Sequence, residues 1–599
     1  MARQAQLESW WRQASDLLAS GAPVRALPLL KKLAAAMPND PAVHYNLGAC
    51  LIEIGRPGEA YPHLKHALTK GYADPAIDSL FARVAAWFYS LRRFDEAIGV
   101  LRDVLSRHPD NTQLSIRLGD LLREVGRFGE AFVLFDRSLA RRIGLAGRDS
   151  AYLLNALGAT HQNIGALAEA RDAYGRALAA DPSLIVTHKS IRNLLLNMPR
   201  LGSEELFASY CDSARSFRQS AAPRDRFAMI DRTPGRRLRI GYVSSDFRMH
   251  VVGLNLLPLV ENHDRDAVDL FFYSDAGEED QVTQRFKAVA AGWRPVVGLD
   301  DASVARAILT DSIDVVVFLA GTFDANRVCL AAYRVAPVQV SFHDCATSGL
   351  DEMDYFLSDH LLTPQNTSER FTEEIYCLPV FYQYLRLDAP KRSAPPPVMK
   401  AGSITFASFN KPEKINDRVI ALWARILSAV PGSRLLMKYF DFYRGPEAQT
   451  RIAALFAERN IGRDRLEFRS GHDARGNHLA LYDHVDVALD TFPFTGATTT
   501  FEALNAGVPV VSLWGDRYVA RYAGAILCHA GFPEFACVDE EIYFETACAL
   551  ANDPARLSEL RSILPERIAS SPLCDGSAYA RSVEAAYREM WVRFCAAES

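Results

Sequence analysis

The stretch Asp490–Asp516, DTFPFTGATTTFEALNAGVPVVSLWGD, decides the fold of the C-terminal part of the chain. An apolar run, VDVALD at 485–490, precedes its loop, and a second run, VPVVSL at 508–513, follows a short helical pattern at 498–506. Two buried strands joined through one helix predict a βαβ unit in a parallel sheet. The helix therefore begins at the carboxyl edge of the sheet.

The first residues of this helix favour an anion site. Free backbone amides and the helix dipole attract negative charge at a helix N-terminus. Gly496 lets a phosphate approach the backbone, and the hydroxyls of Thr498, Thr499 and Thr500 add donors. The alternative is a capping box with Thr499 as N-cap and Glu502 three residues later, which leaves the glycine and the other threonines unexplained.

Strands alternate with helix-length segments from Arg237 onward, which predicts two doubly wound α/β halves. The predicted strands are 237–247, 270–275, 314–321, 338–343 and 355–359 in one half, and 404–410, 433–439, 465–470, 485–490 and 509–515 in the other. The proline-rich stretch 389–402 separates them. Two such halves place a ligand cleft at the carboxyl ends of both sheets.

The N-terminal third carries a helical repeat instead. Alanines that open a second helix recur at spacings of 34 to 39 residues, at Ala26, Ala60, Ala97, Ala131 and Ala170. Small residues lie twelve positions before each of them, at Ala14, Gly48, Ala85, Gly119 and Gly158, and turn glycines lie five positions before four of them, at Gly21, Gly55, Gly126 and Gly165. A unit of about 34 residues with this pattern predicts a tetratricopeptide solenoid, whose concave face usually binds a protein or peptide.

Composition excludes several other classes. A net charge of −5 over 599 residues argues against a broad nucleic-acid surface, and no apolar run is long enough to predict a membrane span. The ten cysteines include no CxxC pair, so we expect reduced thiols, no metal framework and a cytoplasmic protein.

Further candidates lie at other predicted strand ends. Asn410 ends a strand, and Lys411 and Lys414 follow it, where two cations suit a departing phosphate, although exposed lysines are often plain surface. His250 follows the first strand of the N-terminal half and suits a base, although a lone histidine is more often structural. We assign no metal to the DxD at Asp264–Asp266, which lies in a predicted turn.

These motifs, taken together, resemble the protein O-glycosyltransferase family that includes O-GlcNAc transferase, SPINDLY and bacterial relatives. The matching segments are the repeats and GYVSSDFRMH (241–250), APVQVSFHDCATSGLDEMDYFLSD (336–359), FASFNKPEKI (406–415) and LDTFPFTGATTTFEALNAGVPVV (489–511). The resemblance covers nearly the whole chain. It implies an inverting, metal-independent GT-B enzyme that moves a sugar from a nucleotide donor to serine or threonine of a protein.

The resemblance also implies roles for individual residues. Lys414, with Lys411 beside it, contacts the diphosphate that Thr498 and Thr499 hold from the helix N-terminus. Glu502 matches an acidic residue on the ribose, and His478 matches a histidine that stacks on the base. His250 matches a cleft histidine whose role as base is debated in the family.

Departures from the family pattern leave the donor open. His343-Asp344-Cys345 replaces Gly-Tyr-Pro before the run that contains Thr347, and Gly321-Thr322-Phe323 replaces Gly-His-Thr. His343, Asp344, Thr347 and Asn410 thus become candidates for an altered pocket. The donor stays open among UDP-GlcNAc, GDP-fucose and a CMP-nonulosonate.

The repeats depart as well, because only Asn46 matches the asparagine ladder of O-GlcNAc transferase. We expect a dedicated protein acceptor, for which flagellin is a candidate. The alternatives are a catalytically degenerate GT-B scaffold whose repeats bind a partner, and an enzyme for lipid or small-molecule acceptors. The predicted domains are the solenoid (1–195), linker helices (196–236), the acceptor-side half (237–390), a linker (391–402), the donor-binding half (403–570) and a C-terminal helix (571–599).

Overall fold

The computed structural model describes residues 2–141, 147–218, 227, 230–385, 395–471 and 477–597. The chain divides into two compact units, which are residues 1–160 with 175–182, and residues 161–174 with 183–599. No helix among the described residues combines the length and the apolar character needed to cross a membrane.

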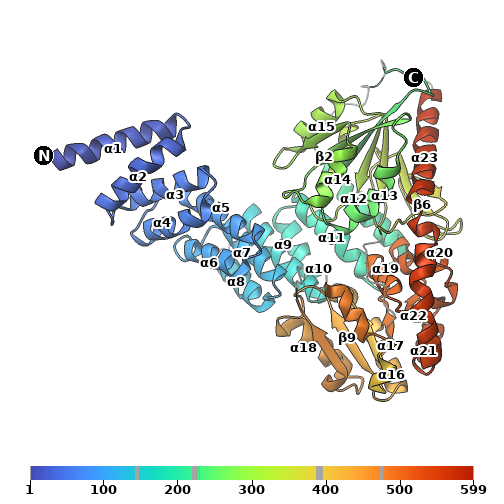
Figure 1. The fold of residues 1–599 in the computed structure, drawn as a ribbon. Helices are drawn as coiled ribbons and strands as arrows, with labels where there is room; N and C mark the ends of the chain where they lie inside the picture. Colours follow the sequence, from blue (N-terminus) through green and yellow to red (C-terminus); the bar gives the residue numbers. More distant parts are fainter. Residues whose placement is uncertain are drawn as a thin grey trace. The chain divides into compact units, whose positions relative to one another are not determined.

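The N-terminal helices form antiparallel pairs (Figure 1), and both helices of the last pair are divided between the two units. The helices are α1 (Ala2–Ala19), α2 (Pro23–Ala36), α3 (Pro41–Glu53), α4 (Pro57–Thr69), α5 (Ala76–Ser90), α6 (Phe94–Leu105), α7 (Thr112–Glu124), α8 (Phe128–Ala140), α9 (Arg148–Asn163) and α10 (Leu167–Ala180). The turn glycines adopt positive φ, as at Gly21 (71°) and Gly126 (72°), which only glycine does without strain. The predicted repeat architecture is confirmed.

Glycines inside the helices let neighbouring helices approach closely. A Cβ on Gly119 of α7 would lie 2.0 Å from the Phe135 ring of α8, and one on Gly48 of α3 would lie 2.6 Å from Leu64 of α4. The helices can therefore pack this closely only because small residues lie at these positions of the repeat.

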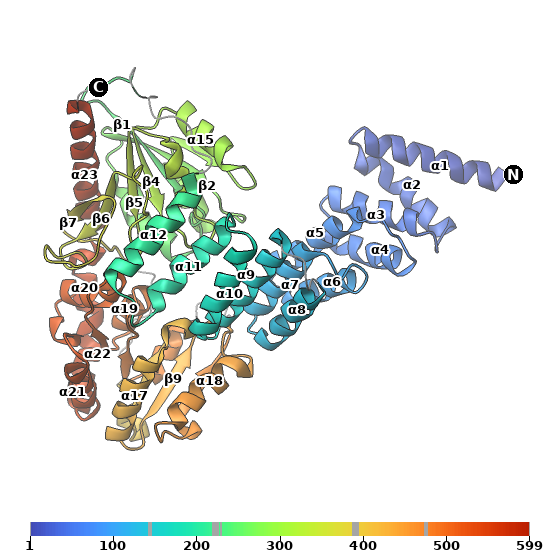
Figure 2. The ribbon, with the colours of Figure 1, turned by 180° about the vertical axis from the view of Figure 1, so that it is seen from behind.

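Helices α11 (Ile185–Asn197) and α12 (Ser203–Phe217) belong to the second unit and lie side by side (Figure 2). They occupy the end of the predicted solenoid and the first part of the predicted linker. Parts of both predicted linkers, at 219–226, 228–229 and 391–394, and the end of the predicted acceptor-side half, at 386–390, lie outside the described residues.

The N-terminal half holds a seven-stranded parallel sheet in the order β3-β2-β1-β4-β5-β6-β7. Its strands are β1 (Leu238–Ser244), β2 (Val268–Ser274), β3 (Gly292–Pro295), β4 (Val315–Leu319), β5 (Val338–Phe342), β6 (Tyr355–Asp359) and β7 (Glu374–Leu378). Its helices are α13 (Val251–Asn262), α14 (Gln281–Val289) and α15 (Asp301–Thr310). The strand order reverses beside β1, and in doubly wound sheets the carboxyl ends of the strands at such a point, here β1 and β4, are where ligands usually bind.

The C-terminal half repeats this plan with six parallel strands in the order β10-β9-β8-β11-β12-β13. Its strands are β8 (Thr405–Ser408), β9 (Arg434–Lys438), β10 (Leu466–Arg469), β11 (Val487–Leu489), β12 (Val510–Leu513) and β13 (Ala536–Cys537). Its helices are α16 (Val398–Ala401), α17 (Asp417–Ala429), α18 (Pro446–Ala457), α19 (Thr498–Asn505), α20 (Tyr522–His529), α21 (Glu540–Ala551) and α22 (Pro554–Ala569). The predicted βαβ unit is β11-α19-β12.

The C-terminal helix α23 (Gly576–Ala596) packs against the N-terminal half (Figures 1 and 2). Buried Tyr587 lies 3.3 Å from the hydroxyl of Tyr242 on β1, and Glu584 pairs with buried His263 at 2.8 Å. The chain therefore returns to its first α/β half after completing the second.

The close approach at Gly119 predicts that Gly119→Ala destabilises the helical array by about 1–3 kcal/mol, because the new methyl group overlaps Phe135. The measurement is the urea midpoint of the full chain followed by circular dichroism. Gly99→Ala on α6 is the matched control, since a Cβ there meets nothing within 4 Å and alanine favours the helix by about 0.5–1 kcal/mol. Equal midpoints for the two variants would contradict the packing argument.

Candidate functional site

Buried Asp490 organises the carboxyl edge of the second sheet. It directly follows β11, and its Oδ1 accepts the amide of Gly496 at 2.8 Å while its Oδ2 accepts the hydroxyl of Ser512 on β12 at 2.7 Å. The Asn410 amide, at the end of β8, lies 3.3 Å from Oδ1. One carboxylate thus connects the ends of three neighbouring strands with the loop that leads into α19.

The N-terminus of α19 lacks the predicted cap. Its N-cap is Ala497, which has no side-chain hydrogen bond, and Thr499 lies inside the first turn. The capping box with Thr499 as N-cap and Glu502 was therefore wrong, because the helix begins earlier than that pattern requires. The first amides of α19 receive no side-chain cap from Ala497.

The three threonines differ in what their hydroxyls contact. Thr500 donates to the carbonyl of Gly496 at 3.0 Å, which stabilises the turn. The hydroxyl of Thr498 is buried and has no hydrogen-bond partner among the described residues. A Cβ on Gly496 would lie 2.3 Å from the Thr499 hydroxyl, so this position requires glycine. An uncapped helix start with an unpaired buried hydroxyl is suited to bind an anion.

Lys414 provides the cation of the site. It ends a short 3-10 helix (Pro412–Lys414), and its Nζ donates to the carbonyl of Thr495 at 3.0 Å and lies 3.8 Å from the ring centroid of Phe494. Burial lowers its pKa to about 8, against the opposing charge of Asp490. The ammonium group is held at the loop before α19 without a direct ion pair to Asp490 in the described structure.

Two further predicted residues lie on the same half. Lys411 is 42% exposed, and its Nζ lies 3.8 Å from Glu413 and 5.9 Å from the ring of Tyr439. Glu502 is half-buried on α19. Burial raises the pKa of Tyr482, and the negative charge of Glu502 raises it further. The side chain of His478 lies outside the described residues.

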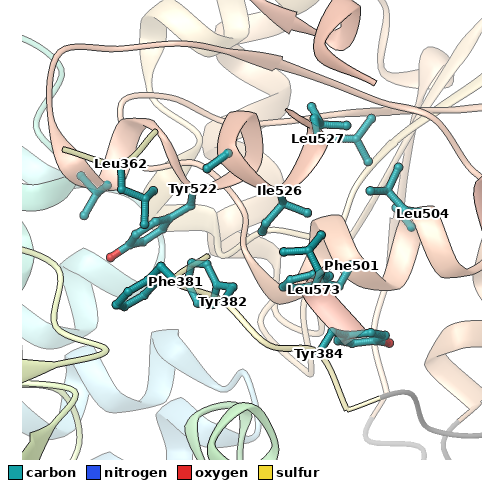
Figure 3. Packing of buried hydrophobic residues seen from close by; sticks show 14 of the residues in the cluster. Leu362, Phe381, Tyr382, Tyr384, Phe501, Leu504, Tyr522, Ile526, Leu527 and Leu573 are labelled. Carbon is teal, nitrogen blue, oxygen red and sulfur yellow. The ribbon is translucent and has the colours of Figure 1, made fainter. Parts of the chain in front are cut away.

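Aromatic side chains fix the position of α19 from the N-terminal half. Tyr384, from the segment after β7, stacks on Phe501 of α19 with ring centroids 4.8 Å apart and an interplanar angle of 6°. Tyr382 meets both Phe501 and Tyr522 of α20 (Figure 3). The two α/β halves therefore share one apolar core around helix α19.

The segment His343-Asp344 follows β5 and is buried. His343 has a φ of +54°, its ring packs against Phe342 and Phe381, and burial lowers its pKa to about 3. Burial raises the pKa of Asp344 to about 7, and a Cβ on Gly321 would lie 2.1 Å from its carboxylate oxygen. The aspartate at 344 therefore requires the glycine at 321.

Thr347 supports the same segment from within. Its hydroxyl donates to Glu373 at 2.7 Å and lies 3.0 Å from that of Thr372. These contacts hold the turn after His343 in place. The Thr347 hydroxyl is therefore already hydrogen-bonded within the N-terminal half.

His250 is the N-cap of α13, at the carboxyl end of β1. Its Nδ1 accepts the amide of Val252 at 3.4 Å and lies 3.5 Å from Asp246, while its Nε2 lies 3.4 Å from Asp324. Sequence reasoning found the histidine and missed both aspartates. Asp246 was visible in the same SSDFRMH segment, whereas Asp324 lies 74 positions later and only the fold brings it to His250.

Helix α11 holds the loops at this edge of the first sheet. Lys189 donates to the carbonyls of Asn326 at 2.8 Å and Asp324 at 3.4 Å, and the Asn193 side chain accepts the hydroxyl of Thr322 at 2.9 Å. Arg192 donates to the carbonyls at 347 and 348. Sequence reasoning assigned this helix to the repeats and missed its polar contacts.

Comparison with known proteins agrees with this architecture. The family model for glycosyl transferase family 41 matches residues 219–384 and 398–583, and tetratricopeptide repeat models match 17–84 and 111–183. A mutant O-GlcNAc transferase of Thermobaculum terrenum superposes with a TM-score of 0.79 at 31% identity, covering 86% of this chain and 98% of that one. The predicted combination of repeats and a GT-B body is confirmed.

Plant proteins named SPINDLY, described as probable UDP-N-acetylglucosamine–peptide N-acetylglucosaminyltransferases, are similar in sequence. The protein from Solanum lycopersicum is 34% identical over 411 residues, covering 67% of this chain and 44% of that protein. The protein from Arabidopsis thaliana is 34% identical over 371 residues, covering 61% and 40%. The chain spans less than half the length of these relatives. Because the family model matches more than half of its residues, the chain belongs to glycosyl transferase family 41.

Proposed function

We propose that this protein transfers a sugar from a nucleotide donor to serine or threonine of a protein acceptor. The observation that carries the proposal is the position of Lys414, which is bonded to the loop just before the uncapped start of α19, where the buried Thr498 hydroxyl has no partner in the described part of the chain. A cation, free amides and an unpaired hydroxyl suit a leaving group that departs as a phosphate anion. Membership of family 41 and the repeats support the transferase and its protein acceptor.

The proposed reaction inverts the anomeric carbon and uses no metal. The acceptor hydroxyl attacks the face of the sugar opposite the nucleotide, a base at the cleft takes its proton, and the nucleotide leaves with the bonding electrons. Lys414 and α19 stabilise the charge that develops on the phosphate. His250, beside the first sheet, is the base that the sequence suggests.

The donor is proposed to be one of UDP-GlcNAc, GDP-fucose and a CMP-nonulosonate. Glu502 is placed near the ribose and His478 near the base of the nucleotide. Flagellin is the proposed acceptor, bound by the repeats, and the cytoplasm is the proposed compartment because the ten cysteines are free thiols. No nucleic acid or membrane takes part in this scheme.

A second candidate is a scaffold that binds a partner through its repeats without catalysis. The buried contact between Asp344 and Gly321 favours it, because both residues belong to segments that differ from the family pattern. The two candidates differ in turnover, since a scaffold need not release nucleotide from any donor.

Lys414→Met is expected to weaken nucleotide binding by about 10- to 100-fold, because a hydrogen bond to a charged group is worth about 1.5–3 kcal/mol. Titration calorimetry of the full chain with UDP, GDP and CMP measures the effect and identifies the nucleotide. Lys400→Met, at an exposed lysine of α16, is the matched control and should bind as the wild type does. If the wild type bound none of the three nucleotides, the result would contradict the transferase proposal and favour the non-catalytic scaffold.

Nucleotide affinity is expected to fall as the pH rises above about 8, by up to about tenfold per pH unit, because burial lowers the pKa of Lys414 to about 8. The folded site binds phosphate best with the ammonium charged, so deprotonation before binding weakens the complex. Lys414→Arg keeps its charge and should show no such decline. The same decline in both proteins would mean that another group is responsible.

A further inference from the structure

We propose that Asp324 takes the proton of the acceptor hydroxyl, and that His250, with Asp246 behind it, is the residue that positions Asp324. This inference rests on the proposed function and replaces His250 as the base. It concerns the carboxyl edge of the first sheet, where β1 and β4 end on either side of the strand-order reversal.

The hydrogen bonds of His250 direct a proton toward Asp324. Its Nδ1 accepts the amide of Val252 at 3.4 Å, which leaves the ring proton on Nε2. Nε2 lies 3.4 Å from Oδ2 of Asp324. An unprotonated Nε2 would point its lone pair at a carboxylate oxygen, which is unfavourable. The ring is therefore better suited to donate a hydrogen bond to Asp324 than to act as the base.

Asp246 lies on the buried side of the His250 ring. It lies 3.5 Å from Nδ1 of His250, and its oxygens accept the Ser245 hydroxyl at 3.0 Å and the Asn326 amide at 2.8 Å. The tautomer in which Nδ1 accepts from Val252 therefore places a proton between His250 and Asp324.

The backbone holds Asp324 with its side chain exposed at the carboxyl edge of the first sheet. Asp324 has a φ of +49°, its side chain is 53% exposed, and Lys189 donates to its carbonyl at 3.4 Å. A non-glycine residue in this conformation is uncommon and often functional when its surroundings hold it there. Lys189 and Asn326 together fix this loop on helix α11 and strand β1.

Asp324 also faces the other half of the enzyme. The pKa of Lys411 is raised by the neighbouring Tyr439, and further by Glu413 and by Asp324. Lys411 lies three residues before Lys414 of the phosphate site. The carboxylate of Asp324 therefore contacts His250 of the first half and adds to the negative charge around the lysine loop of the second.

The proton transfer balances without another reactant. The acceptor oxygen forms a bond to the anomeric carbon while the bond from that carbon to the phosphate oxygen breaks, and the nucleotide leaves with the electron pair. The hydroxyl proton passes to the carboxylate of Asp324, and the Nε2–H of His250 holds that carboxylate in place.

A divalent cation is the competing use of these three residues, since one ligand atom from each lies within 4.8 Å of the others. The contacts favour the proton role. His250 presents a different nitrogen to each carboxylate, and the oxygens of Asp246 already accept hydrogen bonds from Ser245 and Asn326.

The test measures nucleotide release from UDP-GlcNAc, GDP-fucose and a CMP-nonulosonate by the full chain, with water or serine- and threonine-containing peptides as acceptors. Asp324→Asn should lower kcat by about 100- to 10,000-fold, the range of general acid–base catalysis. Its nucleotide affinity by calorimetry should stay within about twofold of wild type. Asparagine tolerates left-handed backbone as aspartate does, so the loop is retained.

Two histidine variants test the positioning role. His250→Gln keeps a donor near Asp324 and should retain most of the activity, whereas His250→Ala should lose about 10- to 100-fold. Asp266→Asn, at an exposed turn of the same half, is the control and should match the wild type.

Three results would overturn the inference. Asp324→Asn could keep its activity while His250→Gln and His250→Ala are equally inactive, which would make His250 the base. EDTA could abolish activity and Mn²⁺ could restore it. If the electron spin resonance signal of Mn²⁺ also changed on binding to the wild type but not to the Asp324 and His250 variants, the three residues would be a cation site. A wild type that binds nucleotide but releases none from any donor would refute the proposed function as well, whereas an active Asp324→Asn variant refutes only the role of Asp324.

Discussion

The carboxylate of Asp490 is the constraint on which the C-terminal site depends. It is buried, it follows β11, and it accepts hydrogen bonds from the Gly496 amide, the Ser512 hydroxyl and the Asn410 side chain. Replacing water around a buried carboxylate requires such partners, so the loop of residues 491–497 has one arrangement that satisfies it. That arrangement starts α19 at Thr498 without a side-chain cap and brings the Thr495 carbonyl to Lys414.

The N-terminal half depends on a comparable constraint from outside its sheet. Helix α11 binds the loop after β4 through Lys189 and Asn193, and it binds the segment after β5 through Arg192. Arg517, after β12 of the other half, donates to the carbonyls of Leu195 and Met198 at the end of the same helix. The side chains and the C-terminal carbonyls of one helix therefore connect loops from the carboxyl edges of both sheets.

The sequence predicted the elements whose patterns are local. The turn glycines and the βαβ unit at 485–513 were found because positive φ needs glycine and buried strands need apolar runs. The edge strands β3, β7 and β13 were missed, since β3 and β7 are largely exposed or half-buried and β13 has two residues. Asp324 was missed because its contact with His250 depends on tertiary structure, whereas the start of α19 at Thr498 agrees with the predicted helix at 498–506 and excludes the alternative capping box at Thr499.

The central claim is that a nucleotide phosphate binds where Lys414 meets the start of α19. The most direct measurement is a crystal structure of the full chain with the nucleotide that binds best among UDP, GDP and CMP. The account predicts a phosphate within hydrogen-bond distance of the Thr498 hydroxyl, the first amides of α19 and Nζ of Lys414. A nucleotide bound elsewhere, with Lys414 still donating to Thr495 and Thr498 still unpaired, would contradict it.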